Sequence, residues 1–419
     1  MSRAGRVVIV GGGVIGLSCA HYLLDRGHRV KVLERGGPDR DCCSLGNAGF
    51  ISPSHILPLA APGVVGQALR SVGNPESPIY VRPRLDAEFL SWGVRFWRAA
   101  TAARAHRAGP LLRDLNLLSR SLYQEIADST GDDFGLEREG LLMLFRSGKA
   151  LEREARHAAR VRELGMPAEV LDASQVAERE PGVTFDVCGG VFYPLDAHLT
   201  PQRFVAALAR SITERGGTIA WNTEALDWRR EGRQIRAVIT SCGESIGEEF
   251  VLAAGSWSSR LARRVGLALP LEPGKGYSLT IDAPRERPRR ALLLEEARVA
   301  VTPMGTTLRV GGTMELAGFD PRVGSARVRG IVGSLVRYLP AFRTEDFASV
   351  RPWHGFRPLS PDGLPYIGRS GRFENLAVAT GHAMMGLSMG PITGKLIAEQ
   401  LSGERPSVDL TALSPDRYG

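Results

Sequence analysis

Three glycines and a carboxylate near the amino terminus have the spacing of a dinucleotide-binding turn. Gly11, Gly13 and Gly16 form a G-x-G-x-x-G motif, and Glu34 stands at the end of the predicted strand 29–33 that follows it. In such a turn the first glycine permits a tight bend, the second lets the backbone approach a pyrophosphate, and the third lets a helix pack closely on a strand. Glu34 can accept hydrogen bonds from ribose hydroxyls and would repel a 2′-phosphate, which disfavours NADP. We therefore predict that this turn binds a dinucleotide.

A second glycine-rich turn lies near the carboxy terminus, between the apolar run 375–379 and a helical run that ends at 401. A helix amino terminus aimed at a ligand stabilises negative charge there, which a reduced flavin carries and a nicotinamide does not. An ordinary strand–loop–helix crossover is the alternative interpretation. The residues of interest in this turn are Gly381, His382, Gly386, Leu387 and Ser388.

One arginine stands in a stretch that is rich in proline and glycine. Residues 355–368 are predicted to form a rigid, extended connection that holds Arg357 on a stiff backbone. An arginine placed in this way suits bidentate capture of a carboxylate. A surface salt bridge is the alternative.

The elements that must position these residues follow from the hydrophobic pattern. A strand at 6–10, a helix at 17–26 and a strand at 29–33 make a βαβ unit. An apolar strand over 250–254 leads into a turn that ends at Trp257, and short alternating runs at 276–281, 298–303 and 307–311 indicate an antiparallel sheet. Helical stretches at 85–128 and 147–163 are interpreted as amphipathic, with a solvated face over a core. These patterns predict an α/β fold, α+β overall.

Composition limits the partners. The chain has 419 residues, which favours two domains, and a net charge of +8. No dense Lys/Arg run with interleaved aromatics is present, so we expect no nucleic-acid binding, whereas weak attraction to an anionic membrane face needs no motif. Five cysteines without zinc-site spacing predict reduced thiols and no metal site. No segment reaches about 18 apolar residues, so we expect a soluble, cytoplasmic protein, with peripheral attachment to the inner membrane face as an option.

Several motifs together resemble the D-amino-acid oxidase superfamily, most closely its bacterial D-amino-acid dehydrogenase branch, which includes D-proline and hydroxyproline-type dehydrogenases. The resemblance runs nearly end to end and is more specific than the glycine fingerprint alone. Apart from the first turn, it rests on Ser44–Gly49, Ser52-Pro53, Pro58–Gly63, Gly274–Thr280, Pro361–Gly363 and Gly381-His382.

The resemblance implies a Rossmann-type FAD-binding domain and a discontinuous mixed-sheet substrate-binding domain. The FAD-binding domain would take residues 1–60, 196–260 and 350–419, and the substrate-binding domain 61–195 and 261–349. FAD would be extended and noncovalent, because no cysteine follows Cys242. The predicted cofactor-binding residues are Gly11, Gly13, Val14, Ile15, Gly16, Glu34, Arg35, Ser44, Asn47, Ala48, Gly49, Ile51, Ala225, Ala254, Gly255, Trp257, Gly381, His382, Gly386, Leu387 and Ser388.

The same resemblance implies oxidation of a small D-amino acid, of the D-alanine or D-proline/cis-4-hydroxy-D-proline type. The substrate carboxylate would bind Arg357, and hydride would pass from the α carbon to flavin N5, giving an imine and then a 2-oxo acid or a pyrroline carboxylate. Electrons would go on to a quinone or a carrier. His55, Tyr277 and His382 are predicted to line the substrate site, and no residue is assigned as acid or base.

Two alternatives remain open from the sequence. One is an oxygen-using oxidase of glycine, sarcosine or D-amino acids, and the other is the flavin subunit of a hetero-oligomeric dehydrogenase. Phe50, Ser54 and His55 depart from the Gln, Gly and Tyr that the resemblance would place near the flavin, so the amino acid itself is not predicted.

Overall fold

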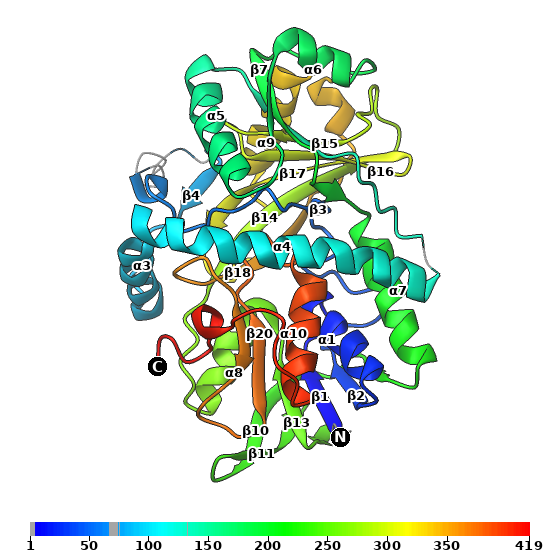
Figure 1. Cartoon of the computed structure of the whole chain (residues 1–419), viewed down its shortest axis with the longest axis vertical. Coiled ribbons are helices and arrows are strands. Elements are labelled where there is room, and N and C mark those ends of the chain that lie inside the picture. The colour runs from blue at the N-terminus through cyan, green and yellow to red at the C-terminus, as the bar shows by residue number, and fades with distance from the viewer. Residues whose placement is uncertain (1–4, 67–73, 75, 132) are drawn as a thin grey trace.

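The computed structural model describes residues 5–66, 74, 76–131 and 133–419. Figure 1 shows two stacked parts, with the long helix α4 (Ala102–Thr130) crossing between them. The lower part holds both chain termini, and the upper part is built around a larger sheet. Within the described residues, no helix combines the length and apolarity that crossing a membrane requires.

A six-stranded sheet forms the centre of the lower part. Its strand order is β19-β20-β13-β1-β2-β9, and all neighbours are parallel except the β19–β20 pair. The predicted strand–helix–strand unit is confirmed, and its apolar strands are buried as a parallel sheet requires. The strands are β1 (Arg6–Val10), β2 (Arg29–Leu33), β9 (Thr218–Ala220), β13 (Glu249–Leu252), β19 (Tyr366–Arg369) and β20 (Leu376–Thr380).

A nine-stranded mixed sheet forms the upper part, in the order β18-β14-β17-β16-β15-β5-β7-β6 with β4 paired to β17. The three predicted alternating runs lie in neighbouring antiparallel strands. The strands are β4 (Ile79–Val81), β5 (Leu141–Phe145), β6 (Glu169–Asp172), β7 (Gly189–Tyr193), β14 (Glu272–Ile281), β15 (Ala291–Leu294), β16 (Val299–Met304), β17 (Thr307–Leu316) and β18 (Trp353–Leu359). The fold is therefore mixed α/β, as the sequence predicted.

Two smaller sheets complete the strands. β10 (Ala225–Glu231), β11 (Gln234–Thr240) and β12 (Gly243–Ile246) form an antiparallel meander, and β3 (Phe50–Ile51) pairs with β8 (Ala197–His198). Strands of the six-stranded sheet come from three separated stretches of chain, whereas β18 joins the upper sheet. The predicted domain boundaries stay a prediction.

The predicted helical stretch 85–128 is divided into two helices. Asp86 caps the start of α3 (Ala87–Ala99), because its side chain accepts from the Phe89 N–H, and Thr101 caps the start of α4, because its hydroxyl accepts from the Arg104 N–H. Such side chains satisfy the free N–H groups of a helix start, which is why a new helix begins directly after Thr101. The other helices include α1 (Val14–Asp25), α5 (Gly148–Glu163), α6 (Ala173–Arg179), α7 (Pro201–Glu214), α8 (Ser258–Arg264), α9 (Ser325–Tyr338) and α10 (Gly390–Leu401).

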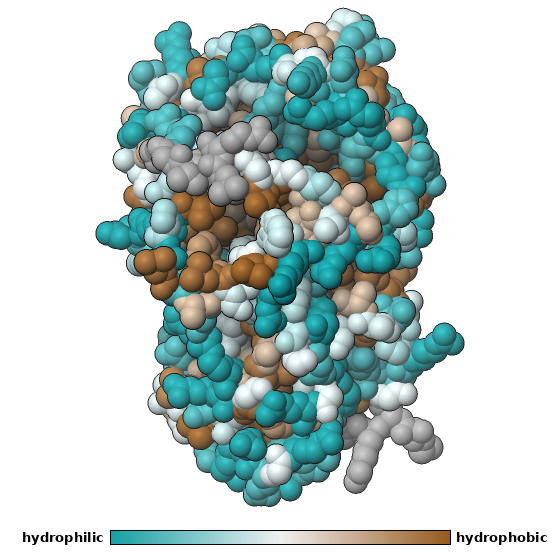
Figure 2. Space-filling view, turned by 90° about the vertical axis from the view of Figure 1, so that its left-hand side faces the viewer, coloured by the Kyte–Doolittle hydropathy of each residue, from teal (hydrophilic) through white to brown (hydrophobic). Residues whose placement is uncertain are grey.

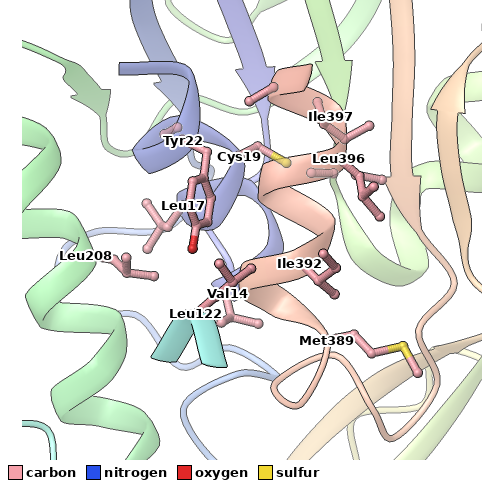
Figure 3. Close-up of a cluster of buried hydrophobic side chains, with 14 of the residues drawn as sticks. Val14, Leu17, Cys19, Tyr22, Leu122, Leu208, Met389, Ile392, Leu396 and Ile397 are labelled. Atoms are coloured by element: carbon pink, nitrogen blue, oxygen red, sulfur yellow. The ribbon is translucent and has the colours of Figure 1, made fainter. Parts of the chain in front are cut away.

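Helices α1 and α10 pack side by side although they lie at opposite ends of the chain (Figure 3). A Cβ atom on Gly394 would lie 2.4 Å from the Ser18 backbone, and one on Gly390 would lie 3.2 Å from a Val14 methyl group. The helices are therefore parallel and in close contact, so their amino termini lie together.

Replacing Gly394 with leucine is expected to force α1 and α10 apart and to lower the free energy of unfolding by roughly 1–3 kcal/mol. Urea denaturation measures this change. Gly148→Ala is the control, because a Cβ at that helix position meets no atom within 4 Å. Equal stability of the two variants would contradict the close packing.

Candidate functional site

A cavity of about 1620 Å³ joins the two glycine-rich turns. Gly11, Gly13 and Val14 line it from the first turn, and Gly386 and Leu387 line it from the second. Residues from both ends of the chain thus face one space, which is large enough for an extended dinucleotide.

The first turn is built for close approach to a ligand. Gly11 has φ +112°, and a Cβ there would lie 2.4 Å from the Ala253 carbonyl oxygen, so only glycine fits. The Val14 N–H at the start of α1 donates to the Ser44 hydroxyl over 3.0 Å, and both residues line the cavity. Glu34 is held by the Gly12 N–H at 2.8 Å and the Gly36 N–H at 2.9 Å. Its carboxylate therefore has a fixed position at the cavity wall, where a ribose could reach it.

The far end of the cavity brings together predicted residues from three stretches. Arg35 lies over the Trp257 ring, with 3.7 Å from the guanidinium carbon to the ring centroid, a cation–π contact. Ala225, Ala254 and Gly255 line the cavity beside them. These predicted cofactor-binding residues therefore line the same cavity.

The second turn leaves a buried polar atom without a partner. His382 has its Nε2 2.9 Å from the Thr393 hydroxyl, while its Nδ1 is buried and bonded to nothing in the part of the chain that the structure describes. Burial lowers the pKa of His382 to about 3, so the ring is neutral near pH 7. An unpaired buried nitrogen is costly unless a ligand satisfies it.

Of the other predicted cofactor residues, three line the cavity and five do not. The lining ones are Ile15, Asn47 and Ala48. Those away from the wall support it instead: a Cβ on Gly16 would lie 1.9 Å from the Gly11 oxygen, and Ser388 accepts from the Ser52 N–H. The residues that do not line the cavity are Gly16, Gly49, Ile51, Gly381 and Ser388.

Arg357 lies on strand β18 and lines the cavity. The sequence predicted an extended connection here. The structure instead has a strand, β18, that pairs with β14 in the upper sheet and places Arg357 opposite Gly274. Its Nη1 donates to the Thr313 carbonyl oxygen over 2.8 Å, and no carboxylate of the described residues pairs with it. The pKa of Arg357 is lowered by burial. The surface salt bridge considered for this residue is therefore absent from the described residues, and the guanidinium faces the cavity.

Thr313 and Gly276 shape this site, and neither was predicted from the sequence to be a site residue. Lys275 pairs with Glu315 and Tyr277 with Gly312, so Thr313 and its neighbour on β17 lie opposite the single residue Gly276, a β-bulge. Thr313 has φ +63°, which is unusual for a β-branched residue.

Both strands of the bulge contact the Arg357 guanidinium, β17 through Thr313 and β14 through Gly276. The Thr313 carbonyl turns toward the guanidinium, and the Thr313 hydroxyl is buried without a partner among the described residues. A Cβ on Gly276 would lie 2.2 Å from the Arg357 guanidinium carbon. No local sequence signal marks the bulge, because it depends on the pairing of two distant strands.

The remaining predicted substrate residues also line the cavity. Burial, with the nearby charges of His157 and Arg298, lowers the pKa of His55 to about 4. Tyr277 is almost fully buried and its hydroxyl donates to the Glu315 carboxylate; burial and this bond raise the Tyr277 pKa. The Tyr277 hydroxyl is therefore already engaged, whereas the His55 ring is neutral near pH 7.

The chain is similar to known oxidoreductases over nearly its whole length. Residues 6–400 match a family model described as FAD dependent oxidoreductase. The chain is 35% identical to a D-amino acid dehydrogenase of Granulibacter bethesdensis and 34% identical to one of Bradyrhizobium diazoefficiens, in each case with 99% of both chains covered. Its fold matches the crystal structure of glycine oxidase from Geobacillus kaustophilus with a TM-score of 0.79 and 26% identity, over 99% of this chain and 100% of that one.

The residues present fit FAD. The glycine cradle at Gly11, the fixed carboxylate of Glu34 and the unpaired Nδ1 of His382 lie along one cavity of sufficient size. Glu34 would hold a ribose, the start of α1 the pyrophosphate, and the second turn the flavin ring.

Glu34→Ala is expected to weaken FAD binding about tenfold, since it removes one fixed hydrogen-bond acceptor. Fluorescence titration of the apoprotein with FAD measures the dissociation constant. Glu231→Ala, at an exposed carboxylate of the β10–β11 hairpin, is the matched control and should leave the constant unchanged. Unchanged binding in Glu34→Ala would remove Glu34 from the cofactor site.

Proposed function

We propose that this chain, which belongs to the family of FAD-dependent oxidoreductases matched by its residues 6–400, oxidises a small D-amino acid. D-alanine and D-proline or cis-4-hydroxy-D-proline are the candidate substrates, giving a 2-oxo acid or a pyrroline carboxylate. The dehydrogenase relatives that match the whole chain support this choice. The observation that carries it is the Arg357 guanidinium, which lines the cavity without a carboxylate partner among the described residues.

Arg357 supplies the charge that would bind the substrate. A partly buried arginine without an anion is destabilised, so a carboxylate entering the cavity would gain both a charge pair and bidentate hydrogen bonds. The Thr313 carbonyl holds Nη1, and the space beside Gly276 accommodates the guanidinium. The unpaired Thr313 hydroxyl is then available to the bound amino acid.

FAD, when bound, accepts the two electrons that leave the Cα–H bond of the amino acid. The protein orients that bond through Arg357 and excludes water with the apolar walls of the cavity. His55 and His382 are both neutral near pH 7, so neither adds a positive charge that would oppose the cationic imine formed when hydride leaves the neutral amine. No side chain is assigned as general base, because a substrate that arrives with a neutral amine needs none.

A quinone or a carrier protein is the proposed electron acceptor, with weak attachment to an anionic membrane face. Oxygen is the second candidate, and the likeness to a glycine oxidase favours it as an alternative. Oxygen uptake with peroxide release would select the oxidase. FAD is proposed to be noncovalent, and its release on acid precipitation tests this.

Arg357→Leu is expected to raise the KM for the amino acid at least about a hundredfold, because a charge-assisted bidentate contact is lost. Steady-state rates with a dye acceptor measure this, and the yellow colour should persist because FAD is bound elsewhere. Arg236→Leu, at an exposed arginine of β11, is the control. An unchanged KM in the Arg357→Leu variant would contradict the proposed substrate site.

The pH profile of kcat/KM should show no inflection from His55 or His382 between about pH 5 and 8, since both pKa values lie below that window. Rates of His55→Asn across this range test the point. The variant should keep every inflection that the wild type shows. Disappearance of one would mean that His55 is charged in the working enzyme.

A further inference from the structure

A carboxylate without an ion pair is buried beside the cavity. Asp196 lies in the turn between β7 and β8 and is 0% exposed, and no Lys or Arg of the described ranges forms an ion pair with it. Burying a charge without a cation is costly, whereas an amide in the same place would make similar hydrogen bonds without a charge. A nearby buried bond is of this neutral kind, because the Ser388 hydroxyl donates to the Asn116 amide oxygen over 2.7 Å. The carboxyl group of Asp196 therefore indicates a use for its proton.

Asp196 is connected to the cavity by one hydroxyl group. The Ser54 hydroxyl donates to Asp196 Oδ2 over 2.7 Å, and the Ser54 N–H donates to Oδ1 over 3.0 Å. Ser54 lines the cavity, whereas Asp196 does not. A proton that leaves a ligand in the cavity can thus reach the carboxylate through Ser54. The glycine that the resemblance would place at this position has no hydroxyl and could not take part.

The segment that carries Ser54 is also bonded to the second glycine-rich turn. The Ser52 N–H donates to the Ser388 hydroxyl over 3.0 Å, and the Ser52 side chain hydrogen-bonds to Asp196. Ser388 belongs to the turn that would hold the flavin ring, and His55, which follows Ser54, lines the cavity. These bonds place Ser54 near the end of the cavity where the flavin ring would lie.

The groups around Asp196 set its affinity for a proton. Burial raises the pKa of Asp196 to about 7, and the hydrogen bonds from the two serines and the charge of Arg120 on α4 oppose that rise. Tyr193 on β7 also faces Asp196, but its hydroxyl donates to Glu154 over 2.6 Å and its pKa is raised, so it stays neutral. A carboxyl group with a pKa near the working pH can both accept and release a proton.

The cavity wall on the α3 side offers a substrate no proton acceptor. Figure 2 shows apolar side chains around a hollow on the side of the molecule where α3 lies. The large side chains that line the cavity from this helix are Phe89, Trp92, Phe96 and Trp97. His55 and His382 are weak bases, because their pKa values are lowered to about 4 and about 3. An ammonium group enclosed by such walls needs another acceptor on the protein before its nitrogen lone pair is free.

We propose that Ser54 and Asp196 form a proton relay that takes one proton from the substrate ammonium. An ammonium N–H bond breaks as its proton bonds to the Ser54 oxygen, while the Ser54 O–H proton moves to Asp196 Oδ2. One proton is transferred, no electrons change place, and the serine hydroxyl is restored. The nitrogen lone pair is then free to form the imine when hydride leaves, and the reverse path returns the proton to water after the product departs. Ser54 contacts the substrate, and Asp196 acts through it.

This inference deepens the proposed function and rests on it for the amino-acid substrate. The pH dependence of kcat/KM with a dye acceptor tests the relay in the FAD-loaded protein. Wild-type kcat/KM should rise as Asp196 ionises and reach a plateau above about pH 7. In Asp196→Asn, which keeps the size of the side chain, kcat/KM should instead rise about tenfold per pH unit until the free substrate amine is neutral.

The difference between the two proteins should therefore depend on pH. Asp196→Asn should be at least about tenfold slower than wild type near pH 7.5 and should equal wild type once the free amine is neutral. A role confined to holding the fold would lower kcat/KM by the same factor at every pH. Ser54→Ala should follow the Asp196→Asn profile, because it removes the hydroxyl and leaves the carboxylate. Ser54→Thr should restore the wild-type profile, because it returns a hydroxyl.

Glu180→Gln is the matched control, because it makes the same carboxylate-to-amide change at a buried residue that does not line the cavity. Its profile should match wild type. Infrared titration of the FAD-loaded protein without substrate is a second measurement that needs no activity. The band of one protonated carboxyl group should vanish as the pH rises through about 7 in wild type and should be missing in Asp196→Asn.

Three results would overturn the relay: a wild-type inflection that persists in Asp196→Asn, a Ser54→Ala profile equal to that of wild type, or infrared spectra in which Asp196 never carries a proton near pH 7. The profile is measured with whichever amino acid bleaches the flavin. Failure of every D-amino acid would therefore count against the proposed substrate and not against the relay.

Discussion

The close packing of α1 on α10 is the contact on which the site depends. Each helix begins directly after one of the glycine-rich turns, and the two helices run in the same direction with Gly390 and Gly394 against the α1 backbone and side chains. Because the helices are parallel and in contact, both turns open on the same cavity. Two segments that are far apart in the sequence are thereby able to hold one FAD. The six-stranded sheet beneath the helices sets the positions from which they start.

The upper sheet contributes the positive charge at the cavity, the guanidinium of Arg357. Its strand β18 carries Arg357 to the cavity, and the bulge opposite Gly276 turns the Thr313 carbonyl toward the guanidinium. A non-glycine residue at φ +63° costs roughly 1–3 kcal/mol, so the surrounding pairing must hold it in place. A partly buried guanidinium without an anion is also costly, and we propose that the substrate carboxylate offsets that cost at Arg357.

The sequence could predict the parts of this site that local patterns encode. The glycine spacing, the apolar strands and Glu34 identify the βαβ unit without reference to the rest of the chain, and the context of Arg357 marked it as a candidate. The Thr313 bulge could not be predicted, because it arises only when β14 and β17 pair. For the same reason Arg357 was expected on a connection and lies on a strand.

The most direct test of the account is anaerobic mixing of the purified yellow protein with single amino acids while the flavin band near about 450 nm is followed. The account predicts that a small D-amino acid bleaches this band and that its L-enantiomer does not. A colourless protein that takes up no FAD, or a band that no amino acid bleaches, would contradict it.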